Sequence, residues 1–155
     1  MSKKVKKLIL SLNTEYSLFG IHTNAPSYKL VYYLNKELNI AFKRDKDINF
    51  LENNKNVYLN KYTYYDLYKE QDWTLVTNET KTKMINSVGA RIFNDELYTN
   101  VHLIPEFKMF NYILKIDGQL DNKKEKMIRM NSILIINIVS IINQSLIRNK
   151  AKLIF

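Results

Sequence analysis

The sequence FNYILKIDGQLDNKKEKMIRMNSILIINIVSII, residues 110–142, decides the fold that we expect for this chain. Residues 110–117 alternate in hydrophobicity and predict a strand, because successive side chains of a strand point to opposite faces. The residues of one face would be Phe110, Tyr112, Leu114 and Ile116. Gly118 follows directly and is expected to end the strand.

The second half of this stretch predicts another strand and a helix before it. Residues 135–142 are apolar and mostly β-branched, which is typical of a strand buried on both faces. Asp121 can cap a helix over residues 121–131, whose inward-facing residues would be Leu120, Met127 and Ile128. Together these elements predict a βαβ unit, in which the two strands are parallel members of one sheet. An apolar run this short also fits a helix, so a helix over residues 133–142 is the competing expectation.

The clearest helix of the chain is predicted near its N-terminus. Asn24 can cap this helix, and Pro26 suits its first turn, where the missing N–H would have no partner in any case. Its apolar face would consist of Leu30, Val31, Leu34 and Leu38, which are spaced as on one side of a helix. We expect the helix to end near Asn39.

Shorter runs predict further strands, and the polar stretches between them predict turns. The predicted strands are residues 5–12, 16–22, 47–51, 57–68, 73–77, 91–93 and 97–101, whereas residues 80–88 fit no single element. The pairs 57–68 with 73–77, and 91–93 with 97–101, would form hairpins. We therefore expect one α+β domain over residues 1–155, with a mixed or antiparallel sheet, one N-terminal helix and a C-terminal βαβ unit. Residues 143–155 would form a loosely packed basic tail.

The composition is that of a globular protein, with 46% hydrophobic and 25% charged residues. Without cysteine the chain has no disulfide and no thiolate metal site, and this fits a reducing compartment. The first apolar run breaks at residues 13–15, and the run over residues 133–142 is about half of the roughly 20 residues that a membrane-spanning helix needs. We therefore expect a cytoplasmic protein that does not bind membranes.

The net charge of +9 raises the question of nucleic-acid binding, because basic surfaces release counterions from phosphate backbones. Only four of the 24 basic residues are arginine, the residue on which base recognition depends most. Lysine, asparagine, isoleucine and tyrosine are all abundant and all have AT-rich codons. Codon bias can therefore account for much of the charge.

The residues Ile104-Pro105-Glu106, followed after three residues by Phe110-Asn111-Tyr112, resemble the signature of the IPExxxVDY family. Residues 18–21, 28–38, 44–47 and 150–155 also resemble blocks of that family, so the similarity extends along nearly the whole chain. The resemblance implies a bacterial protein of a kind associated with Bacteroidota, and no function, because the family has no assigned activity. Phe110 and Asn111 replace the Val and Asp of the signature, which excludes a role for a carboxylate at position 111.

Glu106 is the carboxylate that most invites a catalytic interpretation, but catalysis needs a partner within hydrogen-bond reach. Its place after Pro105 favours a structural role at the start of a helical turn, where an acid interacts with the positive end of the dipole. His22 and His102 could join Glu106 in a two-histidine, one-carboxylate metal site, although nothing in their spacing requires it. We expect no catalytic residue, no metal and no cofactor.

Tyrosines are concentrated between residues 58 and 68, and basic residues near the C-terminus. Aromatic side chains on a strand can stack the bases of single-stranded RNA, and they can equally be ordinary sheet packing or part of a protein interface. The candidate nucleic-acid contacts are Tyr62, Tyr64, Arg148, Lys150 and Lys152. Our leading hypothesis is a non-catalytic protein that binds another protein. An RNA- or ribosome-associated protein is the alternative, and a small-molecule regulatory domain built on the βαβ unit is the third.

Overall fold

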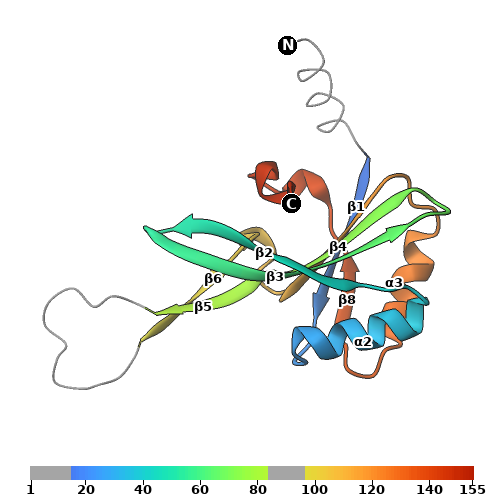
Figure 1. Cartoon of the computed structure of the whole chain (residues 1–155), viewed down its shortest axis with the longest axis horizontal. Helices are drawn as coiled ribbons and strands as arrows, with labels where there is room; N and C mark the ends of the chain where they lie inside the picture. Colours follow the sequence, from blue (N-terminus) through green and yellow to red (C-terminus); the bar gives the residue numbers. More distant parts are fainter. Residues whose placement is uncertain (1–14, 84–96) are drawn as a thin grey trace, which may run out of the picture.

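A computed structural model describes residues 15–83 and 97–155, and an antiparallel sheet of six strands organises them in the order β2-β3-β4-β7-β1-β8 (Figure 1). The described strands are β1 (Tyr16–His22), β2 (Lys43–Glu52), β3 (Lys55–Asp66), β4 (Gln71–Thr77), β5 (Glu79–Lys83), β6 (Tyr98–His102), β7 (Tyr112–Asp117) and β8 (Ile138–Ile141). The helices of this part are α2 (Ser27–Leu38) and α3 (Lys123–Asn131), with short 3-10 turns η1 (Pro105–Phe107), η2 (Gln144–Leu146) and η3 (Lys150–Leu153). The α+β class is confirmed.

The predicted βαβ unit is split by a third strand. β1 pairs antiparallel with β7 on one side and with β8 on the other, so β7 and β8 run in the same direction without being neighbours. β8 covers only Ile138–Ile141 and is an edge strand, with Ile138 and Ile141 partly exposed. The prediction of a strand buried on both faces is therefore wrong, because the local sequence carries no information about which distant strand takes the neighbouring position. A helix over residues 133–142 does not form either.

Helix α2 forms as predicted. Its buried residues are Leu30, Val31, Leu34 and Leu38. It ends at Leu38, and the left-handed backbone of Asn39 turns the chain so that the N–H of Ile40 donates to the carbonyl of Asn35 at 3.1 Å. Asn24 does not cap the helix. Instead, the extended backbone of Pro26 precedes it, and the Pro26 carbonyl accepts the first helical hydrogen bonds.

Helix α3 differs from its prediction at both the cap and the buried face. Asn122 precedes it in a left-handed conformation and makes no side-chain cap. Leu120 and Met130 are buried and Met127 packs against the core, whereas Ile128 is 64% exposed. Positions 127 and 130 are three residues apart and lie on the sheet side, so position 128 is turned toward solvent.

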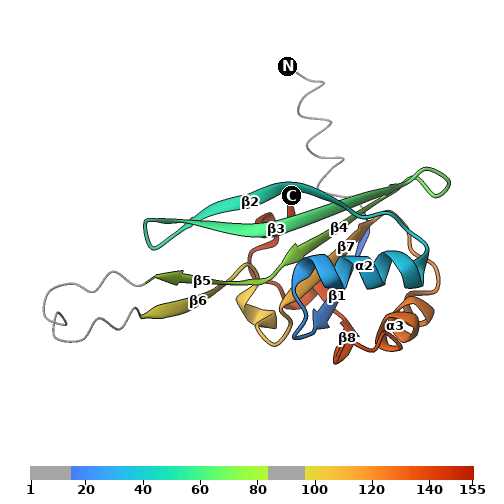
Figure 2. The same cartoon turned by 60° about the horizontal axis from the view of Figure 1, so that its bottom comes forward.

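The hairpins extend further than the sequence predicts. β3 and β4 form the predicted hairpin. β2 begins at Lys43 and not at Asp47, so this edge strand also includes the charged residues 43–46. Asn53 and Asn54 both have positive φ, as a two-residue turn between β2 and β3 requires. β6 pairs with β5, and the predicted strands 5–12 and 91–93 lie outside the described residues. Figure 2 shows the β2–β3 turn and the β5–β6 pair extending from the sheet on the side away from α3, whereas the β3–β4 turn lies at the opposite end.

Two hydrophobic clusters lie on the two faces of the sheet. Helices α2 and α3 cover one face, which we call the helix side, where Phe19, Leu75 and Leu114 are buried (Figure 1). The loop before β7 and the C-terminal residues 142–155 cover the other, which we call the loop side. The C-terminal residues are packed there, with Ile147 and Leu153 buried, and do not form the loose tail that we expected. None of the helices in residues 15–83 and 97–155 is long and apolar enough to cross a membrane.

Candidate functional site

The side chain of Asn78 holds the loop that carries the motif. Asn78 is fully buried just after β4, and its amide nitrogen donates to the carbonyls of Phe107 at 3.1 Å and Phe110 at 2.8 Å. Its Oδ1 accepts the N–H of Ile104 at 2.8 Å, and its backbone N–H donates to Asn111. No local pattern of the sequence marks Asn78, because its partners lie more than 25 residues away along the chain.

Asn111 and Tyr112 bind the segment between β1 and α2. The Oδ1 atom of Asn111 accepts the N–H of Thr23 at 3.0 Å, and its Nδ2 donates to the carbonyl of the same residue. The Tyr112 hydroxyl donates to the carbonyl of Ala25 at 3.0 Å, and burial raises the pKa of Tyr112 to about 12. A carboxylate at position 111 could not donate, so this pair of bonds requires the amide.

Phe110 packs against Gly20 of β1. A Cβ atom at Gly20 would lie 2.2 Å from the Phe110 ring, so only glycine leaves room for the ring here. Phe110 belongs to the cluster on the loop side, whereas Tyr112, Leu114 and Ile116 face the helices. The expectation that all four share one face is wrong for Phe110, because β7 begins only at Tyr112.

Glu106 joins the motif to the C-terminal residues. It follows Pro105 in η1, and its carboxylate accepts the backbone N–H of Arg148 at 2.9 Å. This hydrogen bond, then that from the N–H of Glu106 itself and the charges of Arg148 and Lys152, lowers the pKa of Glu106. The motif residues thus make contacts that hold β1, the start of α2 and the C-terminal segment in place.

No three His, Cys, Asp or Glu side chains converge into a possible metal site within residues 15–83 and 97–155. His22 ends β1 and His102 ends β6, where it pairs with Glu79 of β5. The arrangement of His22, His102 and Glu106 that we considered is therefore not present.

The candidate nucleic-acid contacts are divided between the two faces of the sheet. Tyr62 and Tyr64 lie on the helix side, and Tyr62 is buried, with its hydroxyl 3.0 Å from Ser27 Oγ. The Tyr64 ring packs edge to face against Phe42 and Trp73, and burial followed by the charge of Asp66 raises its pKa.

The three basic candidates belong to the C-terminal segment on the loop side. Arg148 and Lys150 are exposed, and the Lys152 ammonium lies 5.6 Å from the centre of the Phe50 ring. The structure does not bring them together with Tyr62 and Tyr64 into one surface.

Three other tyrosines are exposed on the helix side. Tyr28 and Tyr32 lie one turn apart on α2 and are 72% and 61% exposed, and Tyr58 of β3 is 57% exposed. Ser27, at the start of α2, accepts a 3.0 Å hydrogen bond from Asn60, two residues from Tyr58 on the same side of β3. The start of α2 is thus fastened to the strand that carries Tyr58. We call Tyr28, Tyr32 and Tyr58 the tyrosine surface.

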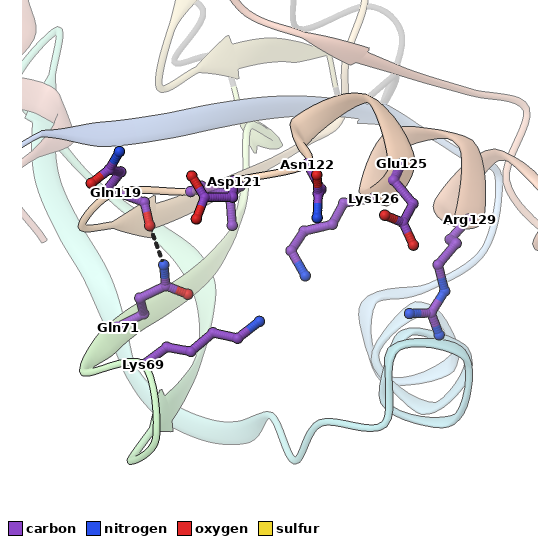
Figure 3. Close-up of a pocket in the computed structure, with 9 residues that line it drawn as sticks. Lys69, Gln71, Gln119, Asp121, Asn122, Glu125, Lys126 and Arg129 are labelled. Atoms are coloured by element: carbon purple, nitrogen blue, oxygen red, sulfur yellow. Dashed lines mark hydrogen bonds between the residues drawn. The ribbon is translucent and has the colours of Figure 1, made fainter.

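A cleft of about 530 Å³ opens between the β3–β4 turn and the start of α3 (Figure 3). Its polar lining includes Lys69, Gln71, Asn122, Lys126 and Arg129. The Lys126 ammonium also lies 5.0 Å from the centre of the Trp73 ring. No sequence pattern predicts the cleft, because its two walls are some 50 residues apart in the chain.

No protein-family model matches this chain, and no curated protein sequence is significantly similar to it. The resemblance to the IPExxxVDY family therefore rests on the signature residues 104–112 and the other similar blocks of the sequence, and it stays a prediction.

Proposed function

We propose that this chain is a non-catalytic protein that binds another protein through the tyrosine surface. The observation that carries the proposal is the exposure of three tyrosine rings, Tyr28, Tyr32 and Tyr58, on the helix side. Tyrosine is enriched at protein interfaces because its ring buries a large area at a small entropic cost while its hydroxyl still finds a partner. Single exposed apolar residues are ordinary, but three from adjoining elements support a binding role.

The charge around the surface indicates what kind of partner would fit. Lys29 and Lys36 are exposed on α2 beside Tyr28 and Tyr32, and the whole chain carries a net charge of +9. An acidic partner surface with apolar groups at its centre would complement this arrangement and would associate faster because of the charge. The lack of cysteine favours a reducing compartment, so we propose the cytoplasm as the location.

RNA binding is less well supported as an alternative. Base stacking needs exposed rings beside a basic groove that follows the backbone. Tyr62 is buried, and the cluster of Arg148, Lys150 and Lys152 belongs to the opposite face of the sheet. Binding a protein through the tyrosine surface therefore needs less change in the structure than stacking RNA bases on the buried Tyr62 would.

Site-specific crosslinking in the host tests this proposal. A photoreactive phenylalanine derivative replaces Tyr32 in one variant and Tyr68 in another, because Tyr68 is fully exposed in the β3–β4 turn and provides a matched control. We expect one protein to crosslink at position 32 and not at position 68. The purified partner should then bind Tyr28→Ala/Tyr32→Ala about 30-fold more weakly than the wild type, as for interface residues worth about 2 kcal/mol.

Two outcomes would contradict the proposal. RNA crosslinked at position 32 in place of protein would favour the alternative. Equal loss of affinity in Tyr68→Ala would show that any exposed tyrosine contributes and that the tyrosine surface has no special role.

A further inference from the structure

The side chain of Gln71 has a buried acceptor without a donor. Gln71 is only 4% exposed, and its amide nitrogen donates to the carbonyl of Gln119 at 2.6 Å. This bond fixes the orientation of the amide, because only the nitrogen can donate to a carbonyl. The Oε1 atom is then left without any partner, although buried acceptors are nearly always paired. In Figure 3 this oxygen points away from Gln119 toward the cleft.

Two ammonium groups converge on the same space. The side chains of Lys69 and Lys126 point toward one another from opposite walls of the cleft (Figure 3). Neither lysine forms an ion pair within residues 15–83 and 97–155. Burial, and then the charges of Lys69 and Arg129, lowers the pKa of Lys126. The charged form of Lys126 is thus less stable here than in water. An anion between the two ammonium groups would relieve that repulsion.

The start of helix α3 contributes to the same cleft. Asn122 and Lys126 both line it, and the helix has no side-chain cap, so the N–H groups of its first turn have no side-chain partner. Such N–H groups and the helix dipole favour a negatively charged ligand. The helix end alone would not define a site, but the unpaired Gln71 oxygen and the two lysines point to the same volume.

The nearby carboxylates offset only part of this positive charge, because the charges of Glu125 and Asp66 raise the pKa of Lys126 less than burial and the charges of Lys69 and Arg129 lower it. Glu125 extends toward the Arg129 side of the cleft in Figure 3, and Arg129 itself donates to the backbone carbonyl of Glu37. Asp121 lies near Gln119, away from the ammonium groups (Figure 3). The space between Lys69 and Lys126 therefore carries a net positive charge. The Oε1 atom of Gln71 is the acceptor at its edge.

We propose that this cleft binds a small phosphorylated metabolite. Its phosphate would lie between Lys69, Lys126 and the start of α3, and one of its hydroxyl groups would donate to Gln71 Oε1. A volume of about 530 Å³ is that of an ordinary small-molecule pocket, and it accommodates a sugar phosphate. The site lies apart from the tyrosine surface, so the proposal stands independently of the proposed function.

Calorimetric titration of the full chain at low salt tests this, with ribose 5-phosphate, inorganic phosphate and ribose as probes. We expect ribose 5-phosphate to bind more tightly than inorganic phosphate, and ribose alone not to bind. Lys126→Met keeps an unbranched side chain of similar length without the charge, and it should weaken binding of ribose 5-phosphate about tenfold, which corresponds to about 1.4 kcal/mol. Lys124→Met is the matched control, because Lys124 is exposed on the same helix and does not line the cleft, and it should leave the affinity nearly unchanged.

Gln71→Met tests the acceptor separately and should reduce the preference for ribose 5-phosphate over inorganic phosphate. Circular dichroism confirms that each variant is folded. If Gln71→Met does not fold, Lys69→Met tests the same wall of the cleft through its ammonium group and should weaken binding of ribose 5-phosphate. The proposal is overturned if no phosphorylated probe binds at millimolar concentration. It is equally overturned if Lys124→Met weakens binding as much as Lys126→Met does, since the general positive field would then explain the affinity.

Discussion

At the scale of single residues, Glu106 connects two segments that are 42 residues apart. Its carboxylate accepts the Arg148 N–H, and this bond lowers its pKa in the folded protein. The lowered pKa means that folding favours the ionised form. The resulting stability is present above the ordinary glutamate pKa of about 4.3 and is lost as the pH falls through the lower folded-state value.

We therefore predict that Glu106→Gln lowers the free energy of unfolding at pH 7 by less than about 1 kcal/mol, since the carboxylate is exposed and the amide oxygen still accepts the bond. The difference from the wild type should disappear in acid, below the folded-state pKa. Urea unfolding of both proteins from pH 7 to pH 2 measures this. A difference that stays constant with pH would show that charge at Glu106 has no role.

At the scale of elements, Asn131 protects the outer edge of β8. Its Oδ1 accepts the N–H of Val139 at 2.7 Å, and its Nδ2 donates to the carbonyl of the same residue at 3.1 Å. Unpaired edge strands with apolar side chains tend to pair with other chains. Ile138 and Ile141 flank Val139 and are partly exposed, so this edge needs such protection.

We predict that Asn131→Ala increases self-association relative to the wild type, because it exposes the Val139 N–H and carbonyl for pairing with a second β8. Sedimentation velocity over a concentration series measures the average mass. Asn131→Asp is the control, since the carboxylate still accepts the Val139 N–H and adds a charge that discourages pairing. An unchanged mass for Asn131→Ala at every concentration would show that the edge needs no protection.

At the scale of the whole molecule, the C-terminal residues complete the second cluster of the core. Leu153 is 2% exposed and belongs to the cluster with Leu18, Leu59 and Ile113 on the loop side of the sheet. The neighbouring Ile154 is 72% exposed. The last turn of the chain therefore contributes to global stability, although its composition is that of a basic tail.

Leu153→Ala should accordingly lower the free energy of unfolding by about 2–5 kcal/mol, as for other buried leucines that leave a cavity. Ile154→Ala, one residue away, should change it by less than about 0.5 kcal/mol, because the side chain is in solvent. Thermal and chemical unfolding of both variants give the comparison. Equal stabilities would mean that the C-terminal segment does not contribute to the core.

Parts of the fold could be predicted where a local sequence pattern determines the type, face or end of an element. The spacing of Leu30, Leu34 and Leu38 on α2 identifies its buried face, and Gly118 ends β7 with a positive φ. The α+β class follows from such local elements. The candidate sites were less predictable, because Asn78 and Gln71 matter only through partners that are distant in the sequence.

The sequence by itself determined where both helices and most of the strands lie, since the period of apolar residues is a local property of the chain. It did not predict β5, whose residues Glu79–Lys83 show no apolar period. Only the tertiary structure decided that β1 separates β7 from β8, that residues 142–155 cover the loop side, and that Tyr62 and Arg148 lie on different faces. These outcomes depend on which strands pair across long separations. The strand order must bury the apolar side chains on both faces of one sheet at the same time. No short stretch of sequence determines that order.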